Sequence, residues 1–277
     1  MNTPKTTAMT TLVSVRELGK TRKNVRLIDC RARLGDLEFG ARAFAGGHIP
    51  GAVRGDLDHN FAGPPGKSGR HPLPDATQLI EHCRQWGIMD SSQIVVYDDM
   101  GGMIAARAWW LLRWLGHAAV VVLDGGLPAW IAAGLPLETT TSTYPLGNFS
   151  RRPALTRAID ASELLSKTPT HLLDARAEER FAGVKEPIDH TAGHIPGAIC
   201  IPAAGNLDAS QHFRPPAELK SRFANITADD VACYCGSGVT AAHNVLALRI
   251  AGFPEPRLYP GSWSEWIEDP TRPIATR

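Results

Sequence analysis

The sequence predicts an α/β protein of two similar domains, each a parallel sheet with helices on both faces. The first observation is a repeat: "RLIDCRARL" at 26–34 returns as "HLLDARAEE" at 171–179, and "GGHIPGAV" at 46–53 returns as "AGHIPGAI" at 192–199. The second is the alternation of short apolar stretches, such as "AVVVLD" at 119–124, with longer amphipathic ones. Fully apolar strands that alternate with helices indicate a parallel sheet that is buried on both faces.

The repeat continues in the same order through both halves. The strand and turn "IVVYDD" at 94–99 correspond to "VACYCG" at 231–236, and "LDGGLPAWIAAG" at 123–134 corresponds to "YPGSWSEWIED" at 259–269. In the second half, helical spacing begins at Val239 and is stopped by Gly252. Each half therefore runs strand, turn, strand, helix.

Domain boundaries follow from composition. The polar, turn-rich segment 139–153 lacks sustained periodicity and is interpreted as a linker, which leaves domains at 1–138 and 154–277. The Gly- and Pro-rich segment 58–74 predicts a long surface loop, and loops of that length are often functional.

Length and charge restrict the function. A chain of 277 residues with a formal net charge of +1 has room for two domains and carries no excess charge that would attract nucleic acid or a membrane surface. Segment 1–15 has no apolar core of a signal peptide, and the sequence has no stretch long enough to span a bilayer. We expect a cytoplasmic protein whose partner is a small molecule.

The cysteines are odd in number and scattered, which does not fit a disulfide framework; they are Cys30, Cys83, Cys200, Cys233 and Cys235. No Cys/His cluster has zinc spacing, so neither a metal nor an organic cofactor is expected. Only Cys235 lies at a strand-to-helix turn, and the other four are interpreted as inert packing thiols.

The surroundings of Cys235 favour a reactive sulfur. Gly236 and Gly238 tolerate positive φ, so the turn "CGSGVT" can direct backbone N–H groups inward, and the helix from Val239 adds its positive end. Both effects favour the thiolate, which is the nucleophilic form. The first half has Asp98 at the corresponding position, so we expect one thiol site per chain, in a cleft between the domains.

The order "GHIPGA", "CGSGVT", "GSWSEW" resembles the tandem-domain rhodanese-like sulfurtransferases, and "CGSGVT" resembles the active loop of the 3-mercaptopyruvate sulfurtransferases. The resemblance implies an inactive N-terminal domain facing a catalytic C-terminal one, and a cysteine that cycles through a persulfide. It assigns catalysis to Cys235 and Ser237, and substrate binding to the loop residues Gly236, Gly238, Val239 and Thr240.

The resemblance also implies residues outside the loop. "DLD" and "HPLP" match the family's first-domain acid and histidine at Asp58 and His71, and "ERF" gives Arg180 for the substrate carboxylate. The family's second carboxylate-binding arginine is replaced by Ile188, for which Lys185 is a possible substitute. Pro260, where many relatives have Asp, has no functional account.

The expected donor is 3-mercaptopyruvate, because the neutral loop touches the reacting sulfur, and Ile188 keeps thiosulfate as the alternative. The acceptor could be cyanide, a dithiol or a protein thiol such as thioredoxin. A cysteine phosphatase is an alternative, but it would need an arginine six residues after the cysteine, where Ala241 lies. A non-catalytic thiol-binding module is a third possibility. His48 and His194 occur in both "GHIPGA" motifs and are interpreted as turn braces.

Overall fold

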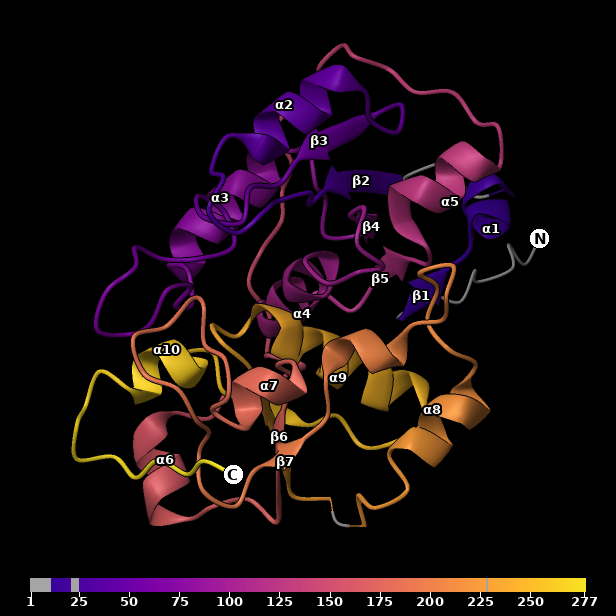
Figure 1. Ribbon diagram of the computed structural model, residues 1–277. Helices are drawn as coiled ribbons and strands as arrows, with labels where there is room; N and C mark the ends of the chain where they lie inside the picture. Colours follow the sequence, from indigo (N-terminus) through magenta and orange to yellow (C-terminus); the bar gives the residue numbers. More distant parts are fainter. Residues whose placement is uncertain (1–10, 21–24, 228) are drawn as a thin grey trace.

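The computed structural model describes residues 11–20, 25–227 and 229–277, which form two separate parallel sheets (Figure 1). The first sheet has the order β1 (Leu12–Val13), β5 (Val120–Leu123), β4 (Gln93–Tyr97), β2 (Val25–Asp29), β3 (Ala52–Arg54). The second has the order β7 (Ile199–Cys200), β6 (His171–Asp174), β8 (Val231–Tyr234), β9 (Arg257–Leu258).

Helices cover both faces of the first sheet. Alternate strand residues point to opposite sides: Leu27 belongs to the core beneath one set of helices and Ile28 to the core beneath the other. The outer set is α1 (Val15–Lys20), α2 (Phe39–Gly46) and α5 (Gly126–Ala132), and the inner set is α3 (Ala76–Gln85) and α4 (Ala105–Trp114).

The second sheet is covered in the same way. Its outer face packs on α6 (Ala161–Ser166) and α10 (Ser262–Trp266), and its inner face on α8 (Pro216–Arg222) and α9 (Val239–Ile250). The short helices α7 (Glu178–Phe181) and η1 (Ala203–Asn206) follow β6 and β7. The predicted fold class, with two similar α/β domains, is confirmed.

The inner helices join the two domains. Helices α4 and α9 contact each other, and one apolar core extends from the first sheet through both helices to the second. Trp109 and Trp110 on α4 are fully buried in this core, as their helical spacing suggested. Because the core is continuous, the two carboxyl-end loop regions are held against each other, which positions the site.

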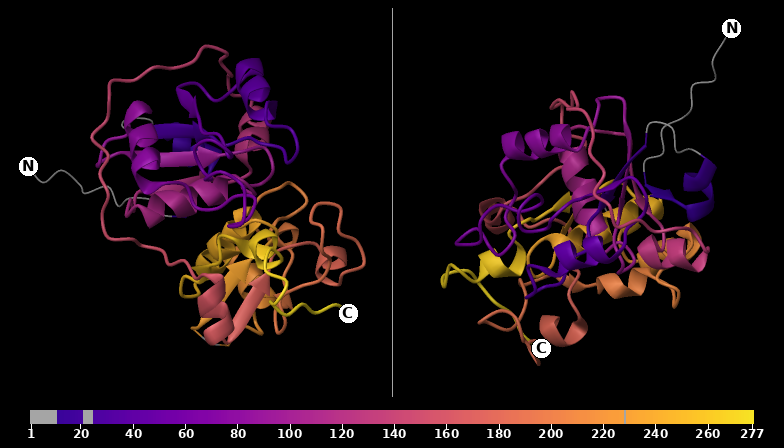
Figure 2. Two further views of the ribbon diagram at one scale, coloured as in Figure 1. Left: turned by 90° about the vertical axis from the view of Figure 1, so that its left-hand side faces the viewer. Right: turned by 90° about the horizontal axis from the view of Figure 1, so that it is seen from above.

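Two irregular segments connect the domains. The predicted linker 139–153 has no helix or strand and runs down the outside of the molecule (Figure 2). It is anchored by the buried Phe149 and by a hydrogen bond of 2.7 Å from Tyr144 Oη to the carbonyl of Gly51. The predicted loop 58–74 likewise lacks helix and strand, and it reaches the second domain.

No helix within the described part of the chain is long and apolar enough to cross a membrane. Most of segment 1–15, on which the prediction of a cytoplasmic location partly depends, lies outside the described residues.

Candidate active site

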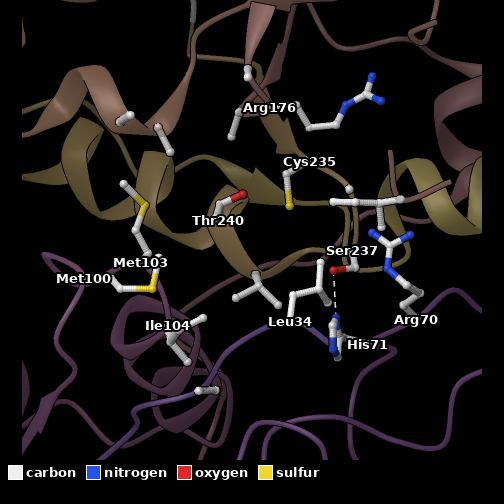
Figure 3. A pocket seen from close by; sticks show the side chains of 18 of the residues that line it. Leu34, Arg70, His71, Met100, Met103, Ile104, Arg176, Cys235, Ser237 and Thr240 are labelled. Atoms are coloured by element: carbon white, nitrogen blue, oxygen red, sulfur yellow. Dashed lines mark hydrogen bonds between the residues drawn. The ribbon is translucent and has the colours of Figure 1, made fainter. Parts of the chain in front are cut away.

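Cys235 lies where the sequence places it, between the end of β8 and the start of α9 at Val239. Its residue is 2 % exposed, and the sulfur points into a cavity between the domains (Figure 3). The N–H of Gly238 donates to Sγ at 3.1 Å, and the N–H of Cys235 donates to Ser262 Oγ at 3.0 Å. One backbone donor and the first turn of a twelve-residue helix thus face the sulfur.

The two loop glycines are needed for different reasons, which corrects the expectation that both adopt positive φ. Gly238 has φ 75°, and a Cβ there would lie 2.3 Å from the carbonyl oxygen of Pro260. Gly236 is not among the positive-φ residues; a Cβ there would lie 2.9 Å from Nη2 of Arg70. Pro260 therefore limits the space behind the loop, and Gly236 leaves room for a cation in front of it.

The first domain shows what the corresponding turn holds when no thiol is present. Asp98 is fully buried, and its carboxylate accepts N–H groups at 2.8–2.9 Å from Met100, Gly102, Ile104 and Ala105. Burial nevertheless raises the pKa of Asp98. The first-domain turn is thus closed by its own acid, and of the two corresponding positions only Cys235 offers a nucleophile to the cavity.

The cavity has a volume of about 440 Å³ and has walls from both domains. Gly236, Ser237, Val239 and Thr240, all expected at the site, line it beside Cys235. Gly238 is not among the lining residues, and its N–H donates to the sulfur. The first domain contributes an apolar wall that sequence reasoning did not find, made by Leu34, Leu57, Met100, Met103 and Ile104.

Asp58, His71 and Ser237 form a hydrogen-bonded chain across the domain interface. Nδ1 of His71 lies 2.7 Å from Ser237 Oγ (Figure 3). Nε2 of His71 lies 3.3 Å from Asp58 Oδ1. Asp58 does not line the cavity itself and reaches it through the histidine. The long loop of the first domain thus brings a titratable group to the residue two positions after the cysteine.

Burial fixes the protonation state of His71. The residue is 5 % exposed, and loss of solvent lowers its pKa from 6.5 to about 4, against the opposing charge of Asp58 and aided by Arg107 and Arg70. The imidazole is therefore neutral near pH 7. Because Asp58 can only accept, Nε2 carries the proton and Nδ1 accepts from the Ser237 hydroxyl.

Arg180, expected to bind the substrate carboxylate, lines the cavity and is paired with two acids of its own domain. Its Nε lies 3.0 Å from both Glu186 carboxylate oxygens, and its Nη2 donates to Asp189 Oδ2 at 2.9 Å. Ile188 also lines the cavity, whereas the suggested substitute Lys185 is exposed and does not.

Sequence reasoning missed two cations. Arg70 pairs with Asp189, and its backbone N–H donates to Ser264 Oγ at 3.0 Å. Arg107 on α4 is fully buried and donates to the carbonyls of His71 at 3.0 Å and Gly238 at 3.3 Å. Burial lowers the pKa of Arg107 to about 10, which leaves it charged at pH 7. Arg70 could have been expected at the site, because it directly precedes His71 in "GRHPLP". No sequence feature pointed to Arg107.

The paired histidines lie away from the cavity. His48 Nδ1 is 2.8 Å from the carbonyl oxygen of Phe44, on whose ring it stacks, and His194 has the same two contacts with Phe181. This duplicated arrangement fits the interpretation as turn braces. Among the residues described here, no group of three or more His, Cys, Asp or Glu side chains is placed to hold a metal ion.

Matches to the rhodanese-like domain cover residues 14–133 and 158–269, one for each sheet. The chain belongs to the rhodanese-like family. The resemblance inferred from "GHIPGA" and "CGSGVT" is thereby confirmed.

The relatives of this rhodanese-like chain are named as sulfurtransferases. It is 50 % identical over 260 residues to a Pseudomonas aeruginosa protein named "Probable 3-mercaptopyruvate sulfurtransferase", covering 90 % of this chain and 92 % of the relative. It is 37 % identical over 257 residues to thiosulfate/3-mercaptopyruvate sulfurtransferase 2 of Arabidopsis thaliana, covering 82 % and 74 %. The solved 3-mercaptopyruvate sulfurtransferase from Leishmania major superposes with a TM-score of 0.83 at 29 % identity, covering 93 % and 74 %. The chain is therefore a sulfurtransferase enzyme.

Proposed function

We propose that this enzyme takes a sulfur atom from 3-mercaptopyruvate, holds it as a persulfide on Cys235 and passes it to a thiophilic acceptor. The observation that carries the choice of donor is the 2.7 Å contact between His71 and Ser237 beside the cysteine. A neutral histidine joined to a hydroxyl can move a proton, and a 2-oxo acid thiol needs one moved when its carbon–sulfur bond breaks.

In the first half-reaction the Cys235 thiolate attacks the sulfur of 3-mercaptopyruvate. The new sulfur–sulfur bond forms as the carbon–sulfur bond breaks, and the electron pair of that bond leaves on the pyruvate enolate. Ser237 Oγ accepts the thiol proton of the donor as its own proton passes to Nδ1 of His71, and Asp58 stabilises the imidazolium that forms. The reverse transfer through Ser237 then delivers the proton to the enolate. The thiol proton of the donor ends on the methyl carbon of pyruvate, so the products are pyruvate and the ionised persulfide.

In the second half-reaction an acceptor nucleophile attacks the outer sulfur of the persulfide. The sulfur–sulfur bond breaks, and the electron pair returns to Cys235 as thiolate. Cyanide would give thiocyanate, and a small dithiol or a protein thiol such as thioredoxin would give a new persulfide. The Gly238 N–H and the positive end of α9 stabilise the thiolate that leaves.

Thiosulfate is the second candidate donor, because the Arabidopsis relative is named for both donors. It needs no proton on its leaving sulfite at neutral pH, so the His71–Ser237 pair would be superfluous with it. The site does not suit a cysteine phosphatase, because the position six residues after the cysteine, where a phosphate-binding arginine would lie, is the fully buried Ala241.

The test is to mix the protein with each donor in the absence of acceptor and to weigh its peptides. We expect one added sulfur on the peptide that contains Cys235, and none after Cys235→Ser, a replacement close in size. Sulfur on a different cysteine would refute the mechanism. A kcat/KM higher for thiosulfate than for 3-mercaptopyruvate, with one shared acceptor, would refute the choice of donor.

A further inference from the structure

Two guanidinium groups from different domains meet over Gly236, the residue that follows the nucleophile. A Cβ on Gly236 would lie 2.9 Å from Nη2 of Arg70 and 3.4 Å from both Nη1 and Nη2 of Arg180. Arg70 comes from the long first-domain loop, and Arg180 from α7 of the second domain. Both line the cavity that contains Cys235, and Figure 3 shows Arg70 there. Two positive charges therefore converge beside the reacting sulfur.

The loop that carries Arg70 is fixed on the second domain. The backbone N–H of Arg70 donates to Ser264 Oγ, and a Cβ on Gly69 would lie 2.8 Å from the carbonyl oxygen of Gly261. Gly69 has φ 95°, a conformation that glycine adopts without strain. This close contact brings the guanidinium of Arg70 across the interface to the end of α7.

Asp189 forms an ion pair with each of the two guanidinium groups. Its Oδ1 pairs with Nη1 of Arg70, and its Oδ2 accepts from Nη2 of Arg180 at 2.9 Å. Glu186 occupies Nε of Arg180. Neither acid is among the residues that line the cavity, whereas both arginines are. The carboxylates thus orient the cations, whose other edges face the cavity.

The two donors nearest Gly236 make no hydrogen bond with the described residues. The side chain of Arg70 pairs through Nη1 and leaves Nη2, which lies 2.9 Å from the Cβ position of Gly236. Arg180 pairs through Nε and Nη2 and leaves Nη1, which lies 3.4 Å from the same position. Charged donors left open in this way are stabilised by an anionic acceptor.

We propose that Arg70, supplied by the first domain, forms with Arg180 a cradle for the carboxylate of the donor and so sets the enzyme's preference for an anionic, carboxylate-bearing substrate. This assignment rests on the proposed function, because the carboxylate in question is that of the 2-oxo acid. Half of the cradle then lies on the first-domain loop, so the site would be incomplete in the second domain alone. A guanidinium presents two parallel N–H groups, a pattern that matches a carboxylate.

The first test does not depend on turnover. Iodoacetate and iodoacetamide both alkylate a thiolate by forming a sulfur–carbon bond and releasing iodide, but only iodoacetate carries a carboxylate next to the reacting carbon. The ratio of their rates at the Cys235 peptide therefore measures recognition of the anion. A charged hydrogen bond contributes about 1.5–3 kcal/mol, so Arg70→Met should reduce the ratio by about 10- to 100-fold.

Arg33→Met is the matched control. Arg33 also lines the cavity from the first domain, but Asp99 binds it through two contacts of 2.9 Å, and it makes no approach to Gly236. Its loss removes one positive charge from the same wall. An unchanged ratio in Arg70→Met, or an equal fall in Arg33→Met, would overturn the cradle. The iodoacetamide rate itself reports whether the site is still folded.

The second test is kinetic. For 3-mercaptopyruvate, Arg70→Met should raise KM by about 10- to 100-fold and leave kcat within a factor of a few, because the cradle binds the part of the substrate that does not react. A fall in kcat at constant KM would contradict the assignment. If Cys235 gains no sulfur from any donor but the alkylation ratio falls in Arg70→Met, the proposed function is refuted and the cradle is supported. If Cys235 gains sulfur but the ratio does not change in Arg70→Met, the cradle is refuted and the proposed function is supported.

Discussion

Acidification to pH 5.5 should leave the imidazole of His71 neutral, whereas an ordinary histidine would be charged. The folded structure lowers the pKa of His71 to about 4 from 6.5, chiefly through burial between the domains. At pH 5.5 a group with a pKa of 4 is about 3 % protonated, and one with a pKa of 6.5 is about 90 % protonated. The contact with Ser237 should therefore persist at this pH.

Nuclear magnetic resonance of protein labelled with ¹⁵N in its histidine rings measures this directly. The His71 signals, identified by their loss in His71→Gln, should show a protonated Nε2, an unprotonated Nδ1 and no change between pH 8 and 5.5. Asp58→Asn should lower the pKa of His71 further, because the charge of Asp58 is what raises it. A ring that titrates near pH 6.5 in the unmodified protein would refute the assigned protonation state.

The same shift has a consequence for stability. The pKa of His71 is lower in the folded protein than in the unfolded chain. As the pH falls from 6.5 to 4, His71 therefore binds a proton in the unfolded chain but stays neutral in the folded protein. The free energy of unfolding should be constant with respect to His71 above pH 6.5 and should fall by about 3 kcal/mol toward pH 4. His243, buried and also shifted to about 4, adds a similar slope, so the His71 part is the difference between unmodified protein and His71→Gln.

Two further substitutions test the loop. Ser237→Ala should reduce kcat for 3-mercaptopyruvate by about 100-fold with little change in KM, because it removes the hydroxyl 2.7 Å from His71. Rapid-mixing kinetics measure both constants, and a change confined to KM would mean that Ser237 only binds substrate. Gly238→Ala should destabilise the protein by about 1–3 kcal/mol in urea unfolding, since φ is 75° and the new Cβ would meet Pro260. Its control is Gly19→Ala on α1, where a Cβ has nothing within 4 Å, and an equal effect of both would disprove the strain argument.

Much of the site could be predicted because its pattern is local. The apolar run before Cys235, the glycines after it and the helical period from Val239 are all encoded within about twenty residues, so strand, turn and helix followed directly. The repeat gave the second domain in the same way, and the resemblance carried by the motifs led to His71 and Ser237. The predicted reason for Gly236, a positive φ, was nevertheless wrong. Its lack of a side chain leaves room for the guanidinium of Arg70.

The sequence by itself therefore determined the two sheets, the position of Cys235 and the family, since hydrophobic period and turn chemistry act between near neighbours in the chain. Tertiary structure alone decided how side chains of the first domain meet the site and that Arg70 is one of them. His71 meets Ser237 across 166 residues, and Arg70 meets Asp189 across 119. Such pairs depend on how α4 packs on α9 and where that docking carries the loop 58–74, and the shape of a buried interface is encoded in no single segment.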